Sequence, residues 1–168
     1  MKYIKRENGF TLLEVLVVII IIGILSAIAI PKLASSAENA RRKADVATAH
    51  QVKGALDRYQ LETGAYPIKD TDLTVSAGTV TSTKLIPIYI SKLDATTTQQ
   101  AVPEGGNKGF GVDLLEVNTS DSTQFIIPDP VADEITNTIM IYLTSNGLAA
   151  EVRVYDEKLE DVLWTSAN

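Results

Sequence analysis

Glu14 is the residue whose type and position point most clearly to chemistry, because it is an acid at the start of a long apolar stretch. From Val15 to Pro31 no residue carries a charge. A carboxylate in hydrocarbon costs about 2.5–3.5 kcal/mol on insertion scales and is rare there without a partner. Two interpretations follow: Glu14 finds a positive partner, or it lies near the cytosolic face, reaches water and has no further role.

Few other residues are suited to chemistry. The chain has no cysteine and one histidine, His50, so thiol catalysis is excluded and a serine triad could be built only around His50. A metal site at His50 lacks a second His or Cys, so we expect a helix-surface or partly buried side chain. Four acids could offer oxygen ligands to Ca²⁺, but their spacing matches no binding loop; they are Asp113, Asp121, Asp129 and Asp133. We predict solvated loop carboxylates there, no metal, no cofactor and no enzymatic activity.

The apolar stretch covers residues 9–31 and reads GFTLLEVLVVIIIIGILSAIAIP. A run of about 18 or more apolar residues is long enough to cross a bilayer. Inside hydrocarbon a lone segment can satisfy its backbone only as a helix. A short head with three basic residues precedes it, namely Lys2, Lys5 and Arg6. By the positive-inside rule the head stays in the cytoplasm and the rest of the chain is exported.

The segment Gly9-Phe10-Thr11-Leu12-Leu13-Glu14 resembles the class III signal of type IV pilins and their relatives. A basic leader, a Gly-Phe junction, an acid four residues beyond Phe10 and a long apolar run occur together. The leader departs from many in the family by ending Asn8-Gly9 instead of Lys-Gly. The resemblance implies cleavage between Gly9 and Phe10 by a prepilin peptidase and methylation of the new Phe10 amine.

That cleavage would give Glu14 a positive partner. The amine of Phe10 lies four residues away, about one helical turn, so the two groups can be neighbours within one chain. The amine of an adjacent subunit could serve equally. The resemblance favours the adjacent subunit, in which case Glu14 and Phe10 form an assembly salt bridge that sets the position of each incoming subunit.

Gly23 and Pro31 interrupt the apolar helix. Glycine costs roughly 1 kcal/mol in a helix interior, and proline removes a hydrogen bond and clashes with the preceding turn. They are either two irregularities that a membrane helix tolerates, or the ends of a segment that can loosen. Pilins that match at both positions are thought to unwind between them on assembly, and we favour this helix-loosening role.

An amphipathic half follows the apolar run. Apolar residues recur at helical spacing among charged ones, at Ala49, Val52, Leu56 and Tyr59. Gly64 is suited to end the helix and Pro67 prevents its restart. We therefore predict one helix over residues 10–62, about 80 Å long at about 1.5 Å per residue. Tyr66, in a Gly-x-Tyr-Pro pattern that resembles one found in many pilins, can pack back on this helix.

The last third of the chain predicts β-structure. Runs of β-branched and aromatic residues indicate strands at residues 139–143, 152–155 and 162–164. Asn146-Gly147 predicts a two-residue hairpin turn between the first two. Residues 125–127 stop at Pro128 and predict a short or edge strand. Residues 110–117 are ambiguous between a strand and a helical turn, and the apolar residues 85–90 predict a turn or short helix over the core.

The predicted fold class is α+β. A long N-terminal helix, apolar in its first half and amphipathic in its second, packs on a C-terminal, mostly antiparallel sheet of three to five strands, as in the pilin fold. We expect a leader (1–9, removed), a transmembrane and assembly helix (10–33) and a headgroup (34–168) with an amphipathic helix (34–62), a variable loop (65–109) and a sheet region (110–168). The predicted core comprises Leu56, Tyr59, Phe125, Ile139, Ile141, Leu143, Val152, Val154 and Trp164.

The resemblance implies a structural subunit of a type IV pilus. Its expected partners are other pilin subunits in a homopolymer, the cytoplasmic membrane before assembly, the prepilin peptidase and the pilus assembly platform. The expected location is the cytoplasmic membrane, as a single-pass subunit, and then an extracellular filament on the cell surface. The net charge of −6 argues against nonspecific nucleic-acid binding, which needs clustered Lys and Arg.

Two alternatives stay open. The first is a major pseudopilin of a type II secretion or DNA-uptake machine, with the same assembly physics. The second is a membrane-anchored extracellular binding or hydrolytic domain, which needs neither Glu14 nor a cut after Gly9. Many Gram-negative pilins close a C-terminal loop with a disulfide, and this chain has no cysteine. That departure points to a Gram-positive or anaerobic relative or to a pseudopilin-like subunit.

Overall fold

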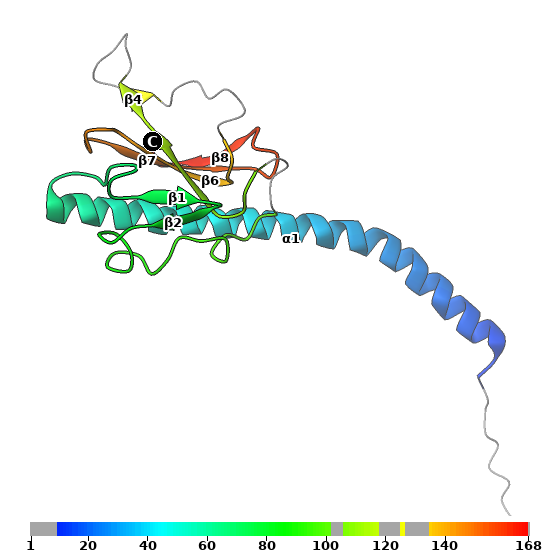
Figure 1. The fold of residues 1–168 in the computed structure, drawn as a ribbon. Helices are drawn as coiled ribbons and strands as arrows, with labels where there is room; N and C mark the ends of the chain where they lie inside the picture. The colour runs from blue at the N-terminus through cyan, green and yellow to red at the C-terminus, as the bar shows by residue number, and fades with distance from the viewer. Residues whose placement is uncertain (1–9, 102–105, 118–124, 127–134, 168) are drawn as a thin grey trace, which may run out of the picture. The chain divides into compact units, whose positions relative to one another are not determined.

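The computed structural model describes residues 10–101, 106–117, 125–126 and 135–167 (Figure 1). The chain divides into two compact units, Met1–Asn39 and Ala40–Asn168. The helix α1, Leu12–Thr63, begins in the first unit and ends in the second. All described strands belong to the second unit.

The predicted long helix is confirmed. It begins at Leu12, two residues after the predicted start at residue 10, and ends at Thr63, one residue after the predicted end at residue 62. Gly64 adopts a φ of 89° and donates its N–H to the Gln60 carbonyl at 2.8 Å. A left-handed residue just past the last turn is the usual way to satisfy a free carbonyl at a helix end, and glycine adopts it without a Cβ penalty. Gly64 therefore ends α1 as its sequence position predicts.

The main sheet has four strands in the order β3-β6-β7-β8 (Figure 1). Their bounds are Phe110–Leu114, Ile139–Leu143, Ala150–Tyr155 and Val162–Thr165. The pairs β6–β7 and β7–β8 are antiparallel, whereas β3 runs parallel to β6 with Phe110 opposite Ile139. The α+β fold class and the mostly antiparallel sheet are confirmed, and β3 with β6 is the parallel pair in this sheet. A long connection between β3 and β6 makes the parallel pairing possible, since parallel strands need a crossover.

The predicted hairpin joins β6 to β7, but its turn is longer than the expected two residues. The last pair of the ladder is Leu143 with Ala150, so six residues form the connection. Gly147 donates its N–H to the Thr144 carbonyl at 3.1 Å and has a φ of 70°. Asn146 and Gly147 thus end a turn that starts at Thr144. The prediction of a two-residue turn was wrong because Thr144 and Ala149 close the loop through their own hydrogen bonds.

Two small hairpins complete the described strands. β1 (Thr74–Ser76) pairs antiparallel with β2 (Thr79–Thr81), in a region where we expected only a variable loop. β4 (Glu116–Val117) pairs antiparallel with β5 (Phe125–Ile126). The ambiguous residues 110–117 are therefore two strands. The short strand predicted at 125–127 is described for its first two residues, and Ile127 and Pro128 lie outside the described residues.

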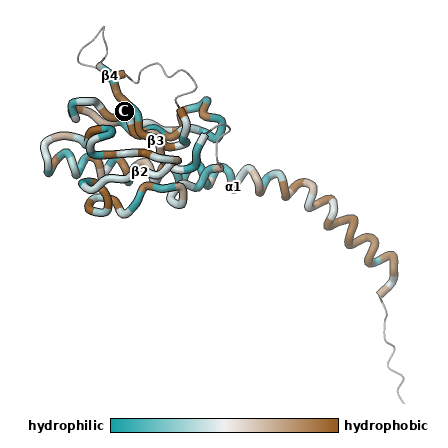
Figure 2. Tube along the Cα trace, viewed as in Figure 1, coloured by the Kyte–Doolittle hydropathy of each residue, from teal (hydrophilic) through white to brown (hydrophobic). Residues whose placement is uncertain are grey.

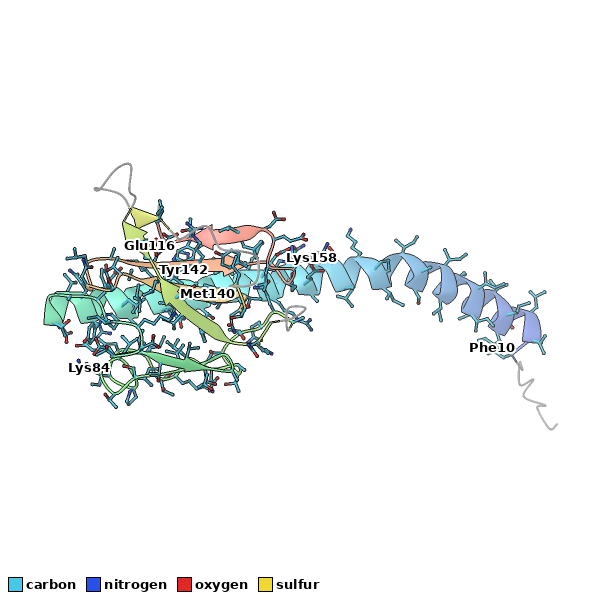
Figure 3. All side chains as sticks on the ribbon, turned by 45° about the horizontal axis from the view of Figure 1, so that its top comes forward. Phe10, Lys84, Glu116, Met140, Tyr142 and Lys158 are labelled. Atoms are coloured by element: carbon cyan, nitrogen blue, oxygen red, sulfur yellow. The ribbon has the colours of Figure 1, made fainter. Side chains whose placement is uncertain are left out.

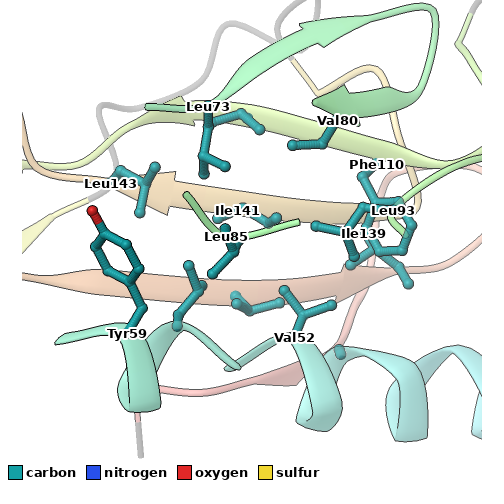
Figure 4. Close-up of a cluster of buried hydrophobic side chains, with 14 of the residues drawn as sticks. Val52, Tyr59, Leu73, Val80, Leu85, Leu93, Phe110, Ile139, Ile141 and Leu143 are labelled. Atoms are coloured by element: carbon teal, nitrogen blue, oxygen red, sulfur yellow. The ribbon is translucent and has the colours of Figure 1, made fainter. Parts of the chain in front are cut away.

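The main core lies between α1 and one face of the sheet (Figure 4). The helix contributes Ala49, Val52, Leu56 and Tyr59. The sheet contributes Phe110, Val112, Ile139, Ile141, Leu143, Val152 and Val154. Leu73, Val80, Leu85 and Leu93 cover it from residues 65–101. The predicted core is confirmed except at two aromatics: Trp164 is only partly buried against the cluster, and the side chain of Phe125 lies outside the described residues.

β6 is buried on both faces, as a central strand often is. Its alternate residues Met140 and Tyr142 leave the main core and form a second cluster with Leu115 and Tyr155. The hydroxyls of Tyr142 and Tyr155 lie 2.9 Å apart in a hydrogen bond. Burial and this hydrogen bond raise the pKa of Tyr142 well above its usual range. The sheet is therefore covered on both sides at its centre.

Candidate functional site

The first part of α1 presents apolar side chains on all sides. Sixteen large apolar residues between Phe10 and Leu33 are 45–88 % exposed. Figure 2 shows that most of this segment is brown, and Figure 3 shows its side chains standing out around the helix, from Phe10 onward. Among the described residues, one helix, α1, is long and apolar enough to span a membrane. A soluble chain does not expose such a surface without something to cover it.

Thr11 and Glu14 form a capping box at the start of α1. The Thr11 backbone N–H and hydroxyl both donate to Glu14 Oε2, at 2.9 and 2.8 Å, and the Glu14 N–H donates to the Thr11 hydroxyl at 3.3 Å. This reciprocal pattern satisfies N–H groups that have no partner inside a helix. This capping box was not predicted, although a Thr followed three residues later by Glu before an apolar run is its signature.

The predicted cleavage and methylation site lies just before this cap. Phe10 directly precedes Thr11 and is 81 % exposed, and Gly9 lies outside the described residues. In the uncut chain the Phe10 nitrogen is part of a peptide bond and carries no positive charge. The salt bridge between Glu14 and the Phe10 amine therefore stays a prediction.

The predicted loosening positions, Gly23 and Pro31, both lie inside α1, which continues through them. A Cβ added at Gly23 would meet no atom within 4 Å, so close packing within the described residues does not explain this glycine. Pro31 has no N–H to donate to the preceding turn. The helix is continuous here, and its local unwinding between Gly23 and Pro31 stays a prediction.

The other candidate residues that the structure describes, His50 and Asp113, do not come together into a reactive group. His50 is exposed and its ring lies 4.3 Å from that of Trp164, centroid to centroid. Both rings line an open groove of about 680 Å³ between α1 and β8. Asp113 accepts a hydrogen bond from Lys69 at 2.9 Å. The other three acids weighed for calcium, Asp121, Asp129 and Asp133, lie outside the described residues. In the part of the chain that the structure describes, no three His, Cys, Asp or Glu side chains are grouped to hold a metal.

Tyr66 packs back on α1, as predicted. Its hydroxyl donates to Asp57 at 2.7 Å, and Asp57 is also paired with Lys53 one helical turn earlier. Burial, and then the hydrogen bond to Asp57, raise the pKa of Tyr66. This network fixes the chain as it turns away from the end of α1.

A family model described as the prokaryotic N-terminal methylation motif matches residues 4–30. It covers the Gly9–Phe10 junction, the Thr11–Glu14 cap and most of the exposed apolar segment. The resemblance to a class III signal is thereby confirmed. Together with the α+β fold of the headgroup, these features make up a pilin-like architecture.

The chain is similar to type II secretion system core protein G of several bacteria. The protein of Klebsiella pneumoniae is 41 % identical over 69 residues, which are 41 % of this chain and 49 % of the relative. The protein of Vibrio cholerae is 40 % identical over 73 residues, 44 % of this chain and 50 % of the relative. The protein of Escherichia coli K12 is 37 % identical over 73 residues, with the same two shares. The chain thus spans about half the length of the curated relatives it matches, and no solved structure matches it.

The chain is homologous to these secretion proteins over the matched residues. The similarity favours the first alternative of the sequence analysis over the type IV pilus that was its main interpretation. None of the three relatives is named for an enzymatic activity. The role in a type IV pilus has no support beyond the initial resemblance.

Proposed function

We propose that this chain is a major pseudopilin, a structural subunit that polymerises through its N-terminal helix into the fibre of a type II secretion machine. The observation that carries the proposal is the exposed apolar surface between Phe10 and Leu33, joined to a methylation motif and to the similarity with core protein G. Lipid covers this surface first, and the helices of other copies replace lipid in the fibre. A type IV pilus subunit is the second candidate, because the assembly physics is the same.

The proposed organisation keeps the expected segments. Residues 1–9 are a leader that a prepilin peptidase removes between Gly9 and Phe10, and the new Phe10 amine is methylated. Residues 10–33 form the membrane and assembly helix, and residues 34–168 form the exported headgroup. The chain waits in the cytoplasmic membrane, with an assembly platform as the partner that extracts it. It acts as a substrate of enzymes and not as an enzyme.

Glu14 has two tasks in this proposal. Before assembly, the hydrogen bonds from Thr11 hold its carboxylate at the start of the helix. During assembly, the methylated amine of a neighbouring Phe10 joins the same carboxylate. A charge pair formed away from water is far stronger than one at a surface, because the effective dielectric constant is lower. The pair therefore selects the position along the fibre at which a subunit is accepted.

The loosening of residues 23–31 is the third element of the proposal. A subunit that leaves lipid for a fibre exchanges one set of neighbours for another, and a helix that can unwind locally adapts more easily. Gly23 and Pro31 supply the two weak points, because one lacks a Cβ and the other lacks an N–H. Residues outside this segment keep their helical hydrogen bonds.

The test is a Glu14→Ala variant produced in cells with a complete assembly machine. We expect normal leader removal and no fibres in electron micrographs of the cell envelope. Glu14→Asp is the matched control, because it keeps the charge, and partial assembly is expected. Normal fibres from Glu14→Ala would remove the assembly role. The length of the wild-type fibres separates the two candidates. Short fibres within the envelope support a pseudopilin, and long surface fibres support a pilus subunit.

A further inference from the structure

Asp45 is the first buried residue along α1. None of the residues of α1 from Leu12 to Ala44 is buried, whereas Asp45 is 0 % exposed. An aspartate is among the residues least often fully buried, and it stays so only when its carboxylate is well hydrogen-bonded. The contacts of this side chain therefore need a reason beyond filling space.

The Asp45 carboxylate holds a segment that is far away in sequence. Oδ1 accepts the backbone N–H of Gln99 at 2.6 Å, and Oδ2 accepts that of Gln100 at 3.1 Å. Hydrogen bonds to a charged acceptor are roughly twice as strong as neutral ones. Both oxygens of Asp45 are thus used to fix one short stretch of backbone to the helix.

Gln100 passes this connection on to the sheet. Its side chain is 1 % exposed, and its Nε2 donates to the Tyr155 carbonyl at the end of β7, at 3.1 Å. A chain of hydrogen bonds therefore runs from α1 through Gln100 to the main sheet. Removing Asp45 would leave the N–H groups of Gln99 and Gln100 without their acceptor, and this is costly for Gln100, which is buried.

A second connection lies one helical turn earlier. Arg42 donates from Nε and Nη2 to Glu157 Oε2, at 3.0 and 2.7 Å. Glu157 belongs to the turn between β7 and β8, where Asp156 Oδ1 accepts the N–H groups of Glu160 and Asp161. The hydrogen bonds of Asp156 thus hold the turn to which Arg42 binds. Both Gln100 and Arg42 therefore bind residues at or just after the end of β7.

We propose that Asp45 and Arg42 form a clamp that stops unwinding of α1 from spreading into the headgroup. The clamp stands before Ala49 and Val52, the first helix residues of the main core. Its role rests on the proposed loosening of residues 23–31, but the clamp itself is a property of the unassembled chain. When the first part of the helix unwinds, the hydrogen bonds of residues 42–45 have to break before any core residue moves.

Hydrogen exchange on the full chain in detergent micelles tests the clamp. In Asp45→Asn, an amide NH₂ replaces one of the two carboxylate oxygens that accept from Gln99 and Gln100. Because one of these hydrogen bonds is lost, we expect amide exchange at residues 40–48 to accelerate roughly tenfold. Exchange at residues 52–59 should stay at the wild-type rate. Glu157→Gln should give a smaller acceleration at residues 40–48, because its pair with Arg42 is partly exposed to water. Glu160→Gln, an exposed acid in the same turn, is the matched control and should change nothing.

Unchanged exchange at residues 40–48 in both Asp45→Asn and Glu157→Gln would overturn the clamp. Equal acceleration of exchange throughout the headgroup in Asp45→Asn would show that this variant is generally destabilised. In that case Glu157→Gln decides: faster exchange confined to residues 40–48 supports the clamp, and unchanged exchange there overturns it. The experiment uses unassembled chain, so its result is independent of whether fibres form. A chain that never assembles and still shows the local pattern would contradict the proposed function and support the clamp.

Discussion

Thr11 donates both its backbone N–H and its hydroxyl to one carboxylate oxygen of Glu14. The acid at the start of the apolar helix is thus held by its own chain before any second subunit arrives. In the proposed assembly step, an incoming amine would meet a carboxylate whose position is already fixed, which would lower the entropy lost on binding. Thr11 would therefore support Glu14 in the proposed assembly step by holding its carboxylate in place.

Thr11→Ala should loosen the first turn of α1. Loss of a capping side chain costs about 0.5–2 kcal/mol, and Glu14 loses one of its two donors. Amide exchange at residues 12–15 in micelles should accelerate, and fibre formation should fall while leader removal continues. Thr11→Ser keeps the hydroxyl and should behave as wild type. A Thr11→Ala chain with unchanged exchange would show that the cap has no part in fixing the helix start.

Leu56→Ala should destabilise the headgroup by about 2–5 kcal/mol, the usual range for a large apolar side chain removed from a core. Leu56 is 0 % exposed and lies in the main core. Leu61→Ala, five residues further on the same helix, is the matched control, because Leu61 is 80 % exposed and its loss should cost about 0.5 kcal/mol or less. Urea unfolding followed by the fluorescence of Trp164 measures both. Equal losses of unfolding free energy in Leu56→Ala and Leu61→Ala would contradict the packing described for α1.

Asp72 should give the headgroup a pH-dependent part of its stability. The hydrogen bond from Lys84, at 2.6 Å, lowers the pKa of Asp72 from its ordinary 3.8; burial opposes this shift and the Ile68 N–H assists it. A lowered pKa means that the folded state favours the carboxylate, so the contribution is present above pH 3.8 and is lost as the pH falls through the lowered pKa.

The check is the urea midpoint measured from neutral pH into the acid range. Asp72→Asn should lower the midpoint at neutral pH, and its difference from wild type should shrink in acid. Asp70→Asn is a suitable control, because Asp70 is exposed and asparagine tolerates its φ of 62°. A difference for Asp72→Asn that is constant with pH would contradict the role of the Lys84 pair.

Pro31→Ala should stiffen the proposed loosening segment. The alanine restores the missing N–H and removes the ring clash, a change of about 3 kcal/mol in favour of the helix. We expect slower amide exchange at residues 27–31 in micelles and fibres that extend less under force. Ala29→Leu is a control for a change of bulk without a change of backbone. Fibres of Pro31→Ala that extend like wild type would remove the loosening role.

Local patterns predicted the parts of the fold that depend on local physics. The period of Ala49, Val52, Leu56 and Tyr59 placed the buried face of α1, and Gly64 placed its end. Alternation and β-branching located β6, β7 and β8 within two residues. The Thr11–Glu14 cap was also readable from sequence, but Glu14 was interpreted only as an acid in hydrocarbon.

The remaining features depend on contacts between distant residues. The parallel pairing of β3 with β6 is set by the path of a long connection, which no local pattern encodes. The burial of Asp45 follows from two backbone N–H groups more than fifty residues later, and backbone donors leave no mark in a sequence. β1 and β2 are short and mostly exposed, so their composition resembles that of a loop.

The most direct test of the account is the mass and N-terminal sequence of the native chain, recovered from the cell envelope with its assembly state preserved. The account predicts a chain that begins at Phe10, carries a methyl group on that amine and is recovered in fibres. Single, unassembled molecules that still begin at Met1 would contradict it, because the exposed helix would then serve only as an anchor.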